Sequence, residues 1–188
     1  YISDFIFPTF PPLMRYHEVV DDIQAEYNVL EVNLQKSADL MTEAGFEKDD
    51  EGYWVQDGKR PECNLIAPEQ HFGDIAPLVA EHMQAAGFDA KHVSPPDVWD
   101  QCATTALLHF FGHHASVIDP YRTMQWYESR WATPTGENCG LNRTRWSNAD
   151  YDAIVEEMAV TPMDDFEALE DQVHRAFTIW FKELPEVP

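Results

Sequence analysis

The most informative stretch of the chain is residues 63–93, which read CNLIAPEQHFGDIAPLVAEHMQAAGFDAKHV. Residues 63–67 form a short apolar run, which is typical of a buried strand, and residues 88–93 alternate as a second strand. Asp74 stands where a helix between the two strands would need an N-terminal cap, and Gly87 stands where that helix would end. A strand, a helix and a strand in this order predict a βαβ unit with parallel strands. The expected inner face of the helix comprises Ile75, Leu78, Val79, Met83 and Ala86.

Further helices and strands are predicted on both sides of this unit. Downstream, residues 95–102 predict a short helix and residues 106–111 a third strand. Upstream, Asn33 is placed to cap a helix that ends at Gly45, and residues 53–55 predict a small hairpin between Asp- and Gly-containing turns. This alternation predicts the α/β class, with a parallel-rich sheet and helices on both of its faces.

Helices dominate the predicted structure of both ends of the chain. Ser147 is placed to cap one helix and Asp164 another, with Thr161–Pro162 between them. The first is expected to bury Tyr151, Ile154, Val155 and Met158, and the second Phe166, Leu169, Val173, Phe177, Trp180 and Leu184. Near the start of the chain, a helical stripe is expected from Val19, Val20, Ile23, Tyr27 and Leu30. Residues 112–146 are predicted to be an irregular loop, and loops of this length in compact domains are more often functional than not.

We expect three segments along the chain. Residues 1–58 would form an extended segment, two helices and the small hairpin, all leading into the main domain. Residues 59–160 would form the α/β domain with a ligand-facing loop at 112–146, and residues 161–188 a terminal helix packed on it. The first residue is not Met and the last lies in a Pro-rich run. We therefore expect a fragment of a longer protein.

The composition excludes several classes of protein and of partner. The 188 residues are 44% hydrophobic, which argues for a folded domain rather than disorder. Asp and Glu number 34 against 12 Lys and Arg, a net charge of −22 that would repel a phosphate backbone, so nucleic acid is not an expected partner. No apolar run reaches the roughly 20 residues needed to span a bilayer. Cys63, Cys102 and Cys139 form no Cys-x-x-Cys pair, so they indicate neither a disulfide framework nor a structural zinc site.

Several short motifs follow one another along the chain. They are Ala38–Phe46, the Asp- and Gly-containing turns, Tyr53–Trp54, the strand–helix–strand unit, Gly112 with Asp119–Pro120, Arg145–Asp152, and a terminal helix running into Leu184–Pro185. In this order and spacing they resemble the C-terminal part of the family 5 extracellular solute-binding proteins. These proteins are the ligand-capturing components of peptide, nickel and oligosaccharide ABC importers. The resemblance covers nearly the whole chain.

The resemblance implies a fold, a function and a location. The fold would be one lobe of a two-lobed, type II periplasmic-binding protein that closes on its ligand at a hinge. The expected partners are an oligosaccharide or peptide ligand, the ABC permease subunits of the membrane and the remaining lobe of the parent chain. The expected location is periplasmic or extracellular, with a membrane anchor in the missing N-terminal part as one form. Neither catalysis nor a cofactor is implied.

The segment from Gly112 to Pro120 suggests where ligand would bind. In peptide-binding relatives the matching stretch carries a Trp and an Asp, and that Asp receives the peptide's amino group. Here His113 stands in place of the Trp and Ser116 in place of the Asp, so the resemblance favours a hydroxyl-rich ligand such as an oligosaccharide. Nearby Trp rings could stack on sugars, although each Trp could equally serve in packing. The predicted ligand-binding residues are His113, His114, Ser116, Asp119, Trp126, Trp131, Arg143 and Trp146.

Three other functions remain open from the sequence. His109, His113 and His114 with Asp119 could form a zinc or nickel site, although no second motif supplies further ligands. The acid pairs Asp49–Asp50 and Glu156–Glu157 could suggest a hydrolase, but a turn and a helix usually expose such pairs to solvent, and no nucleophile or phosphate-loop motif occurs. The aromatic segment 1–12 could belong to an interaction module that associates with itself. Asn142 also begins a short glycosylation pattern.

Overall fold

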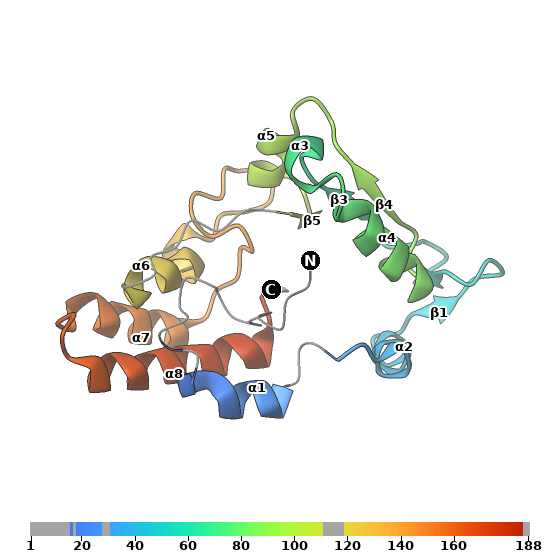
Figure 1. Ribbon diagram of the computed structural model, residues 1–188. Helices are drawn as coiled ribbons and strands as arrows, with labels where there is room; N and C mark the ends of the chain where they lie inside the picture. Colours follow the sequence, from blue (N-terminus) through green and yellow to red (C-terminus); the bar gives the residue numbers. More distant parts are fainter. Residues whose placement is uncertain (1–15, 17, 28–30, 111–118, 186–188) are drawn as a thin grey trace. The chain divides into compact units, whose positions relative to one another are not determined.

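The computed structural model describes residues 16, 18–27, 31–110 and 119–185 (Figure 1). The chain divides into two compact units. The sheet unit comprises Val32–Gly112 and Thr135–Glu137, and the helical unit comprises Tyr1–Glu31, His113–Pro134 and Asn138–Pro188. This division differs from the three segments expected above, which stay a prediction. The aromatic segment at 1–12 lies outside the described residues.

A three-stranded parallel sheet forms the centre of the sheet unit. Its strand order is β4 (Ala90–Val93), β3 (Cys63–Ile66) and β5 (Leu108–His109). Cys63 lies opposite Ala90 in the register. The helices of this part of the chain are α3 (Glu69–Phe72), α4 (Ala76–Ala85) and α5 (Val98–Thr104). The predicted βαβ unit and the α/β class with a parallel sheet are therefore confirmed.

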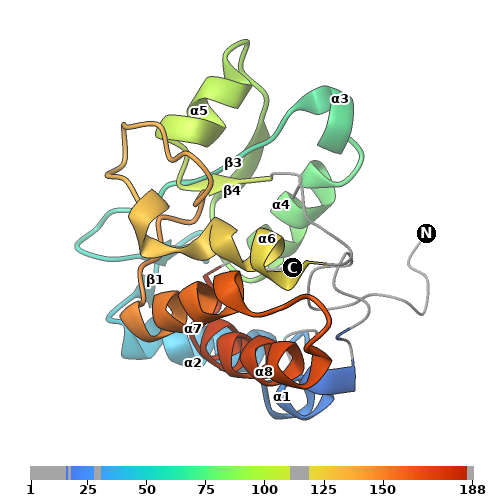
Figure 2. The ribbon, with the colours of Figure 1, turned by 90° about the vertical axis from the view of Figure 1, so that its left-hand side faces the viewer.

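Both faces of β3 are covered by a helix. On one face, Cys63 packs with Ala80 of α4 and Leu65 with Ala76 of α4. On the other face, the side chain of Ile66 packs with Val98 and Cys102 of α5. The strands run between these two helices, as Figure 2 shows. Because β3 is buried on both sides, the buried residues Leu65 and Ile66 follow one another instead of alternating with exposed ones.

The start of α4 differs from the prediction. Its N-cap position is Ile75, which makes no side-chain capping hydrogen bond, so the prediction that Asp74 caps it is wrong. Pro77 falls in the first turn of the helix, where its missing N–H costs nothing. Ala76 and Ala80 are buried, whereas the predicted inner residues Ile75 and Leu78 are exposed. Strand β5 (Leu108–His109) is also shorter than the third strand expected at residues 106–111.

The predicted hairpin and the helix before it are confirmed. Helix α2 (Leu34–Glu43) begins after Asn33, whose Oδ1 accepts a hydrogen bond of 2.9 Å from the backbone N–H of Lys36. It ends before Gly45, where φ is +87° and a Cβ would be strained. Strands β1 (Glu47–Lys48) and β2 (Trp54–Val55) then pair antiparallel.

Arg60 ties the hairpin to the parallel sheet. Its guanidinium donates to Asp49 at 2.8 Å, to Asp89 at 3.2 Å and to Glu51. The same group lies over the ring of Tyr53, 4.3 Å from the centroid. Burial alone would raise the pKa of the Asp49 carboxyl, but the hydrogen bonds from the Tyr53 N–H and from Arg60 outweigh burial and lower it.

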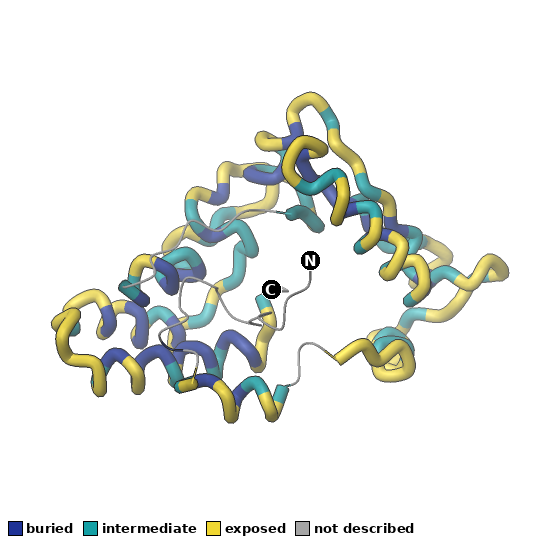
Figure 3. Tube along the Cα trace, in the orientation of Figure 1, coloured by how far each residue is buried: buried dark blue, intermediate teal, exposed yellow. Residues whose placement is uncertain are grey.

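The helical unit is built on two long helices, α7 (Ala149–Val160) and α8 (Phe166–Glu183). The shorter elements are η2 (Glu18–Val20), α1 (Asp21–Tyr27), α6 (Pro120–Met124), η3 (Gln125–Tyr127) and η4 (Ser129–Trp131). The loop predicted at 112–146 therefore contains helical turns, because Asp119 caps a segment in which Pro120 starts a helix. Figure 3 shows the buried residues gathered along the inner sides of α7 and α8.

The caps of these two helices lie one residue beyond the predicted positions. Asn148, not Ser147, caps α7, and Asp165, not Asp164, caps α8. The predicted stripes are confirmed in their centres: Tyr151, Ile154, Val155, Met158, Leu169, Val173, Phe177 and Trp180 are all buried. Phe166 and Leu184, at the two ends of the second stripe, are exposed, so the predicted stripe is too long at both ends. Within the described parts of the chain, no helix is both long and apolar enough to cross a membrane.

Candidate functional site

The parallel strands of the sheet unit bring three chain segments to one edge. β3, β4 and β5 run in the same direction, so their carboxyl ends meet at the same side of the sheet. The segments that leave this edge are residues 67–72 after β3, residues 94–99 after β4, and Phe110 after β5. In open α/β sheets, ligands bind outside the carboxyl ends of the strands. A ligand site is therefore expected at this edge.

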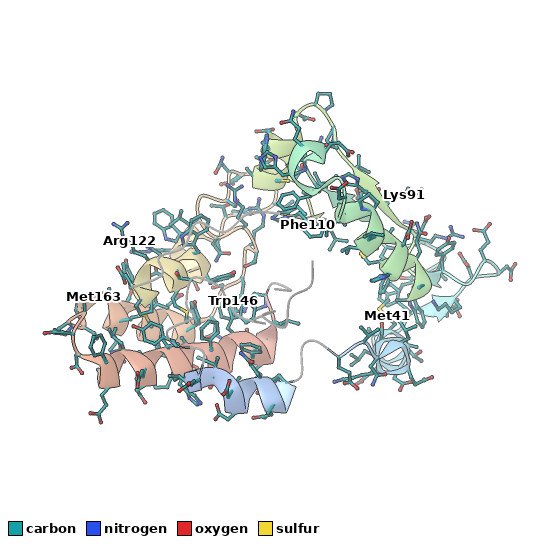
Figure 4. The ribbon with its side chains drawn as sticks, viewed as in Figure 1. Met41, Lys91, Phe110, Arg122, Trp146 and Met163 are labelled. Atoms are coloured by element: carbon teal, nitrogen blue, oxygen red, sulfur yellow. The ribbon has the colours of Figure 1, made fainter. Side chains whose placement is uncertain are left out.

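Four aromatic side chains gather at this edge, and we call them the aromatic edge: His71, Phe72, Trp99 and Phe110. The imidazole of His71 meets the indole of Trp99 at 79°, with ring centroids 5.5 Å apart. The rings of Phe72 and Phe110 are stacked, with centroids 5.3 Å apart, and Phe110 is labelled in Figure 4. The two Phe rings are half-buried, but Trp99 keeps 48% of its surface exposed. The aromatic edge therefore combines two half-buried Phe rings with an exposed Trp ring.

Polar contacts hold the backbone beside the aromatic edge in place. His92 donates from Nε2 to the carbonyl of Ala67 at 3.1 Å, because a carbonyl can only accept. Its Nδ1 lies 3.8 Å from a carboxylate oxygen of Glu69. The backbone N–H of Glu69 donates to the hydroxyl of Ser94 at 3.0 Å. These contacts join the ends of β3 and β4, so the segments that carry His71 and Trp99 are held together.

None of the four residues of the aromatic edge is among the binding residues predicted from the sequence. Trp99 falls in a predicted short helix, and no binding role is predicted for His71, Phe72 or Phe110. A signal was present, since each predicted parallel strand is followed within about six residues by an aromatic or imidazole side chain. That signal has meaning only once the strands are known to be parallel neighbours.

Three of the predicted ligand-binding residues, His113, His114 and Ser116, lie outside the described residues. Asp119 caps α6, where its carboxylate accepts a hydrogen bond of 3.4 Å from the backbone N–H of Arg122. Arg143 is half-buried.

The three predicted Trp residues each contact their own chain. Trp126 is half-buried and packs against the core of the helical unit. Trp131 lies beneath the guanidinium of Arg130, which is 5.3 Å from the ring centroid. Trp146, labelled in Figure 4, donates from Nε1 to Glu183 at 2.6 Å and meets Tyr151 edge-on.

Asn142 is a structural residue of the helical unit. Its side chain is fully buried, and its amide donates to the carbonyl of Glu128 at 3.2 Å and to that of Trp146 at 2.8 Å. A side chain that is buried and so bonded is inaccessible to a glycosyl transferase in the folded protein. A glycan on Asn142 would therefore have to break both hydrogen bonds of this folded unit.

Glu128 is a buried acid in the same unit. Only 4% of its side chain is exposed, and Arg130 donates a hydrogen bond to it at 2.5 Å. Burial raises the pKa of the Glu128 carboxyl above its ordinary value, and the hydrogen bond from Arg130 offsets only part of this rise. The ionised carboxylate of Glu128 therefore lowers the stability of the folded state.

The variant Glu128→Gln is expected to change how stability depends on pH. The pKa of Glu128 is higher in the folded state than in the unfolded state, so the wild type loses stability as pH rises through the range above about 4.5. The glutamine variant lacks this contribution. The difference in unfolding free energy between the two proteins should therefore shift in favour of the wild type as pH is lowered from 7 to about 4. Urea unfolding at several pH values measures this difference, and a constant difference would contradict the prediction.

A metal site finds no support among the described residues. They include no group of three or more His, Cys, Asp or Glu side chains that could hold an ion. The three cysteines are buried free thiols. The alternative built on His109 and Asp119 depends on His113 and His114, which lie outside the described residues, so it stays a prediction.

The fold is similar to that of a protein of known structure. It resembles part of NikZ, a family 5 solute-binding protein, which confirms the predicted resemblance at the level of the fold. One solved structure that matches is NikZ from Campylobacter jejuni in complex with Ni(L-His), with a TM-score of 0.69 and 19% sequence identity. The match covers 82% of this chain but only 31% of NikZ, so the chain spans about a third of that protein. No family model and no curated protein matches the sequence.

Proposed function

We propose that this chain is part of the solute-binding component of an ABC importer. The observation that carries the proposal is the match to NikZ, a binding protein rather than an enzyme, over 82% of the chain. The aromatic edge supports it, because it places exposed ring surface where α/β sheets bind ligands.

The proposed mechanism is reversible capture without bond chemistry. The solute binds between this lobe and the rest of the parent protein, and closure about a hinge buries it. A permease in the membrane then distinguishes the closed, loaded protein from the open, empty one, because solute shifts the population toward the closed form. This role requires a periplasmic or extracellular location.

An oligosaccharide or an oligopeptide is the proposed solute. Support for this comes from the exposed Trp and His rings of the aromatic edge, since such rings stack on sugar faces and on peptide side chains. The residues predicted from the sequence stay part of the proposal as a second set of contacts. A nickel or zinc complex is the second candidate, favoured by the nickel–histidine complex bound to NikZ.

The test is a titration of the full-length protein monitored by intrinsic Trp fluorescence. Oligosaccharides, peptides of two to five residues, and nickel with and without L-histidine are added in separate arms. We expect a saturable change with one class of solute and none with the others. If a folded protein gives no response to any arm, and calorimetry detects no binding either, the proposed function is wrong.

A further inference from the structure

A histidine beside the aromatic edge faces a carboxylate. His92 is the third residue of β4, and only 11% of its side chain is exposed. Its Nε2 lies 3.1 Å from the carbonyl oxygen of Ala67, and its Nδ1 lies 3.8 Å from Oε2 of Glu69, the first residue of α3. The imidazole therefore connects β4 with the segment that leads from β3 into α3.

The carbonyl of Ala67 decides which nitrogen carries the proton in the neutral imidazole. A carbonyl only accepts, so Nε2 donates, and the neutral ring has a bare lone pair at Nδ1. That lone pair faces an oxygen of the Glu69 carboxylate, and two acceptors form no hydrogen bond. A protonated ring presents an N–H and a positive charge to the same carboxylate. The contact with Glu69 is therefore favourable only when His92 is charged.

The packing around Glu69 leaves its carboxylate beside the imidazole. A Cβ at Gly73 would lie 2.7 Å from Oε1 of Glu69 and 2.6 Å from its carbonyl oxygen, so the absence of a side chain at Gly73 makes room for Glu69. The backbone N–H of Glu69 donates to the hydroxyl of Ser94 at 3.0 Å. One carboxylate oxygen thus lies against Gly73 while the other faces His92.

Charged groups on the strands beside His92 pair elsewhere. Lys91, the preceding residue of β4, points to the opposite face of the strand, and its Nζ lies 3.8 Å from Asp89. The residue opposite His92 in β3 is Leu65, which is apolar and buried. The residues that α4 buries are both Ala. Among the described residues, Glu69 is therefore the acid within ion-pair distance of the ring.

We infer that protonation of His92 fastens α3 to the end of the sheet, and with it the part of the aromatic edge that α3 carries, His71 and Phe72. Histidine ordinarily changes its charge between about pH 5 and 8, so the edge is held more firmly in mildly acidic than in mildly alkaline solution. The Glu69 side chain is 69% exposed, so water competes for it, and we expect a gain of only about two- to fivefold. The inference requires no solute and is independent of the proposed function.

Hydrogen exchange on the full-length protein tests the inference. The backbone N–H groups of Phe72 and Gly73 donate to the carbonyls of Pro68 and Glu69 at 2.9 and 3.0 Å, so their exchange reports the opening of α3. Protection is measured at about pH 5.5 and about pH 8 and corrected for the intrinsic effect of pH on exchange. We expect protection of these amides to be about two- to fivefold higher at the lower pH.

Two variants should lose most of this pH dependence. His92→Gln retains an N–H donor for the carbonyl of Ala67 but gains no charge, and Glu69→Gln retains the backbone bond to Ser94 but has no carboxylate. Their protection should stay near the alkaline value of the wild type at both pH values. Circular dichroism should show both variants folded.

Two further variants are matched controls. His82→Gln removes an exposed imidazole of α4, and His71→Gln removes the other imidazole of α3. Both should retain the pH dependence. Equal protection of the wild type at the two pH values would overturn the inference, and so would a difference that persists in His92→Gln. Loss of the difference in His71→Gln would also overturn it, because His71 would then be the group that titrates.

Nitrogen NMR of the wild type provides a second measurement that needs no variant to fold. Nε2 of His92 should carry a proton at both pH values, and Nδ1 should gain one as the pH falls. A neutral ring that carries its proton on Nδ1 would contradict the inference, because it could already donate to Glu69 without a charge.

Discussion

Replacing Trp180 by alanine should destabilise the helical unit by about 3–5 kcal/mol, the usual cost of removing a buried Trp or Phe side chain. Trp180 is fully buried in α8. Its ring contacts Tyr127, Phe177 and Phe181, with centroids 6.0, 6.2 and 5.3 Å away. Alanine would leave a cavity among aromatic rings that cannot close over it, so both burial and packing are lost. The effect is large because a domain is stable by only about 5–15 kcal/mol in total.

Hydrogen exchange measures this prediction in the part of the molecule where it applies. Amide protection along α7 and α8 should fall in Trp180→Ala, and the urea midpoint of the helical unit should fall with it. Phe166→Ala is the matched control, since that ring belongs to the same helix but keeps 42% of its surface exposed. It should cost less than about 1 kcal/mol. Equal losses for the two variants would show that Trp180 is not at the centre of the core.

Replacing Asn142 by alanine should cost about 2–4 kcal/mol, because two carbonyl groups lose their hydrogen-bond donor. The Asn142 amide is the link between the carbonyl of Glu128, which precedes η4, and that of Trp146, which precedes α7. Buried carbonyls without a donor carry the full penalty of desolvation.

Thermal unfolding monitored by circular dichroism measures the loss at Asn142. The variant Asn142→Asp separates hydrogen bonding from packing, because it keeps the side-chain shape but removes the N–H donors at neutral pH. It should be at least as unstable as Asn142→Ala. Thr135→Ala, at an exposed position of the preceding loop, serves as the control and should change stability by about 0.5 kcal/mol or less. A stable Asn142→Asp would contradict the assigned role.

The regular elements could be predicted from the sequence because their causes are local. A five-residue segment with four apolar residues, a helical period and a Gly with a φ of +87° act over a few neighbouring positions. The βαβ unit, the cap at Asn33 and the buried stripe of α7 were predicted for these reasons. The α/β class followed from the order of the same elements.

Where the local sequence allows two roles for a residue, contacts with distant parts of the chain decide between them. Ser147 and Asn148 are both good caps, but the hydroxyl of Ser147 donates to that of Ser129 at 2.8 Å, and Asn148 caps α7. Trp146 was predicted to bind ligand, yet its N–H donates to Glu183, 37 residues further along the chain. No local pattern could indicate that partner.

The sequence by itself determined the elements, their order and the acidic charge of this protein. Only the tertiary structure decided which side chains meet, and the aromatic edge is the clearest case. Its residues are separated by up to 39 positions, from His71 to Phe110, and they meet because β3 pairs in parallel with both β4 and β5. Strand pairing depends on contacts between distant residues, whereas helix and strand periods depend on neighbours, and this is why the site could not be located before the fold.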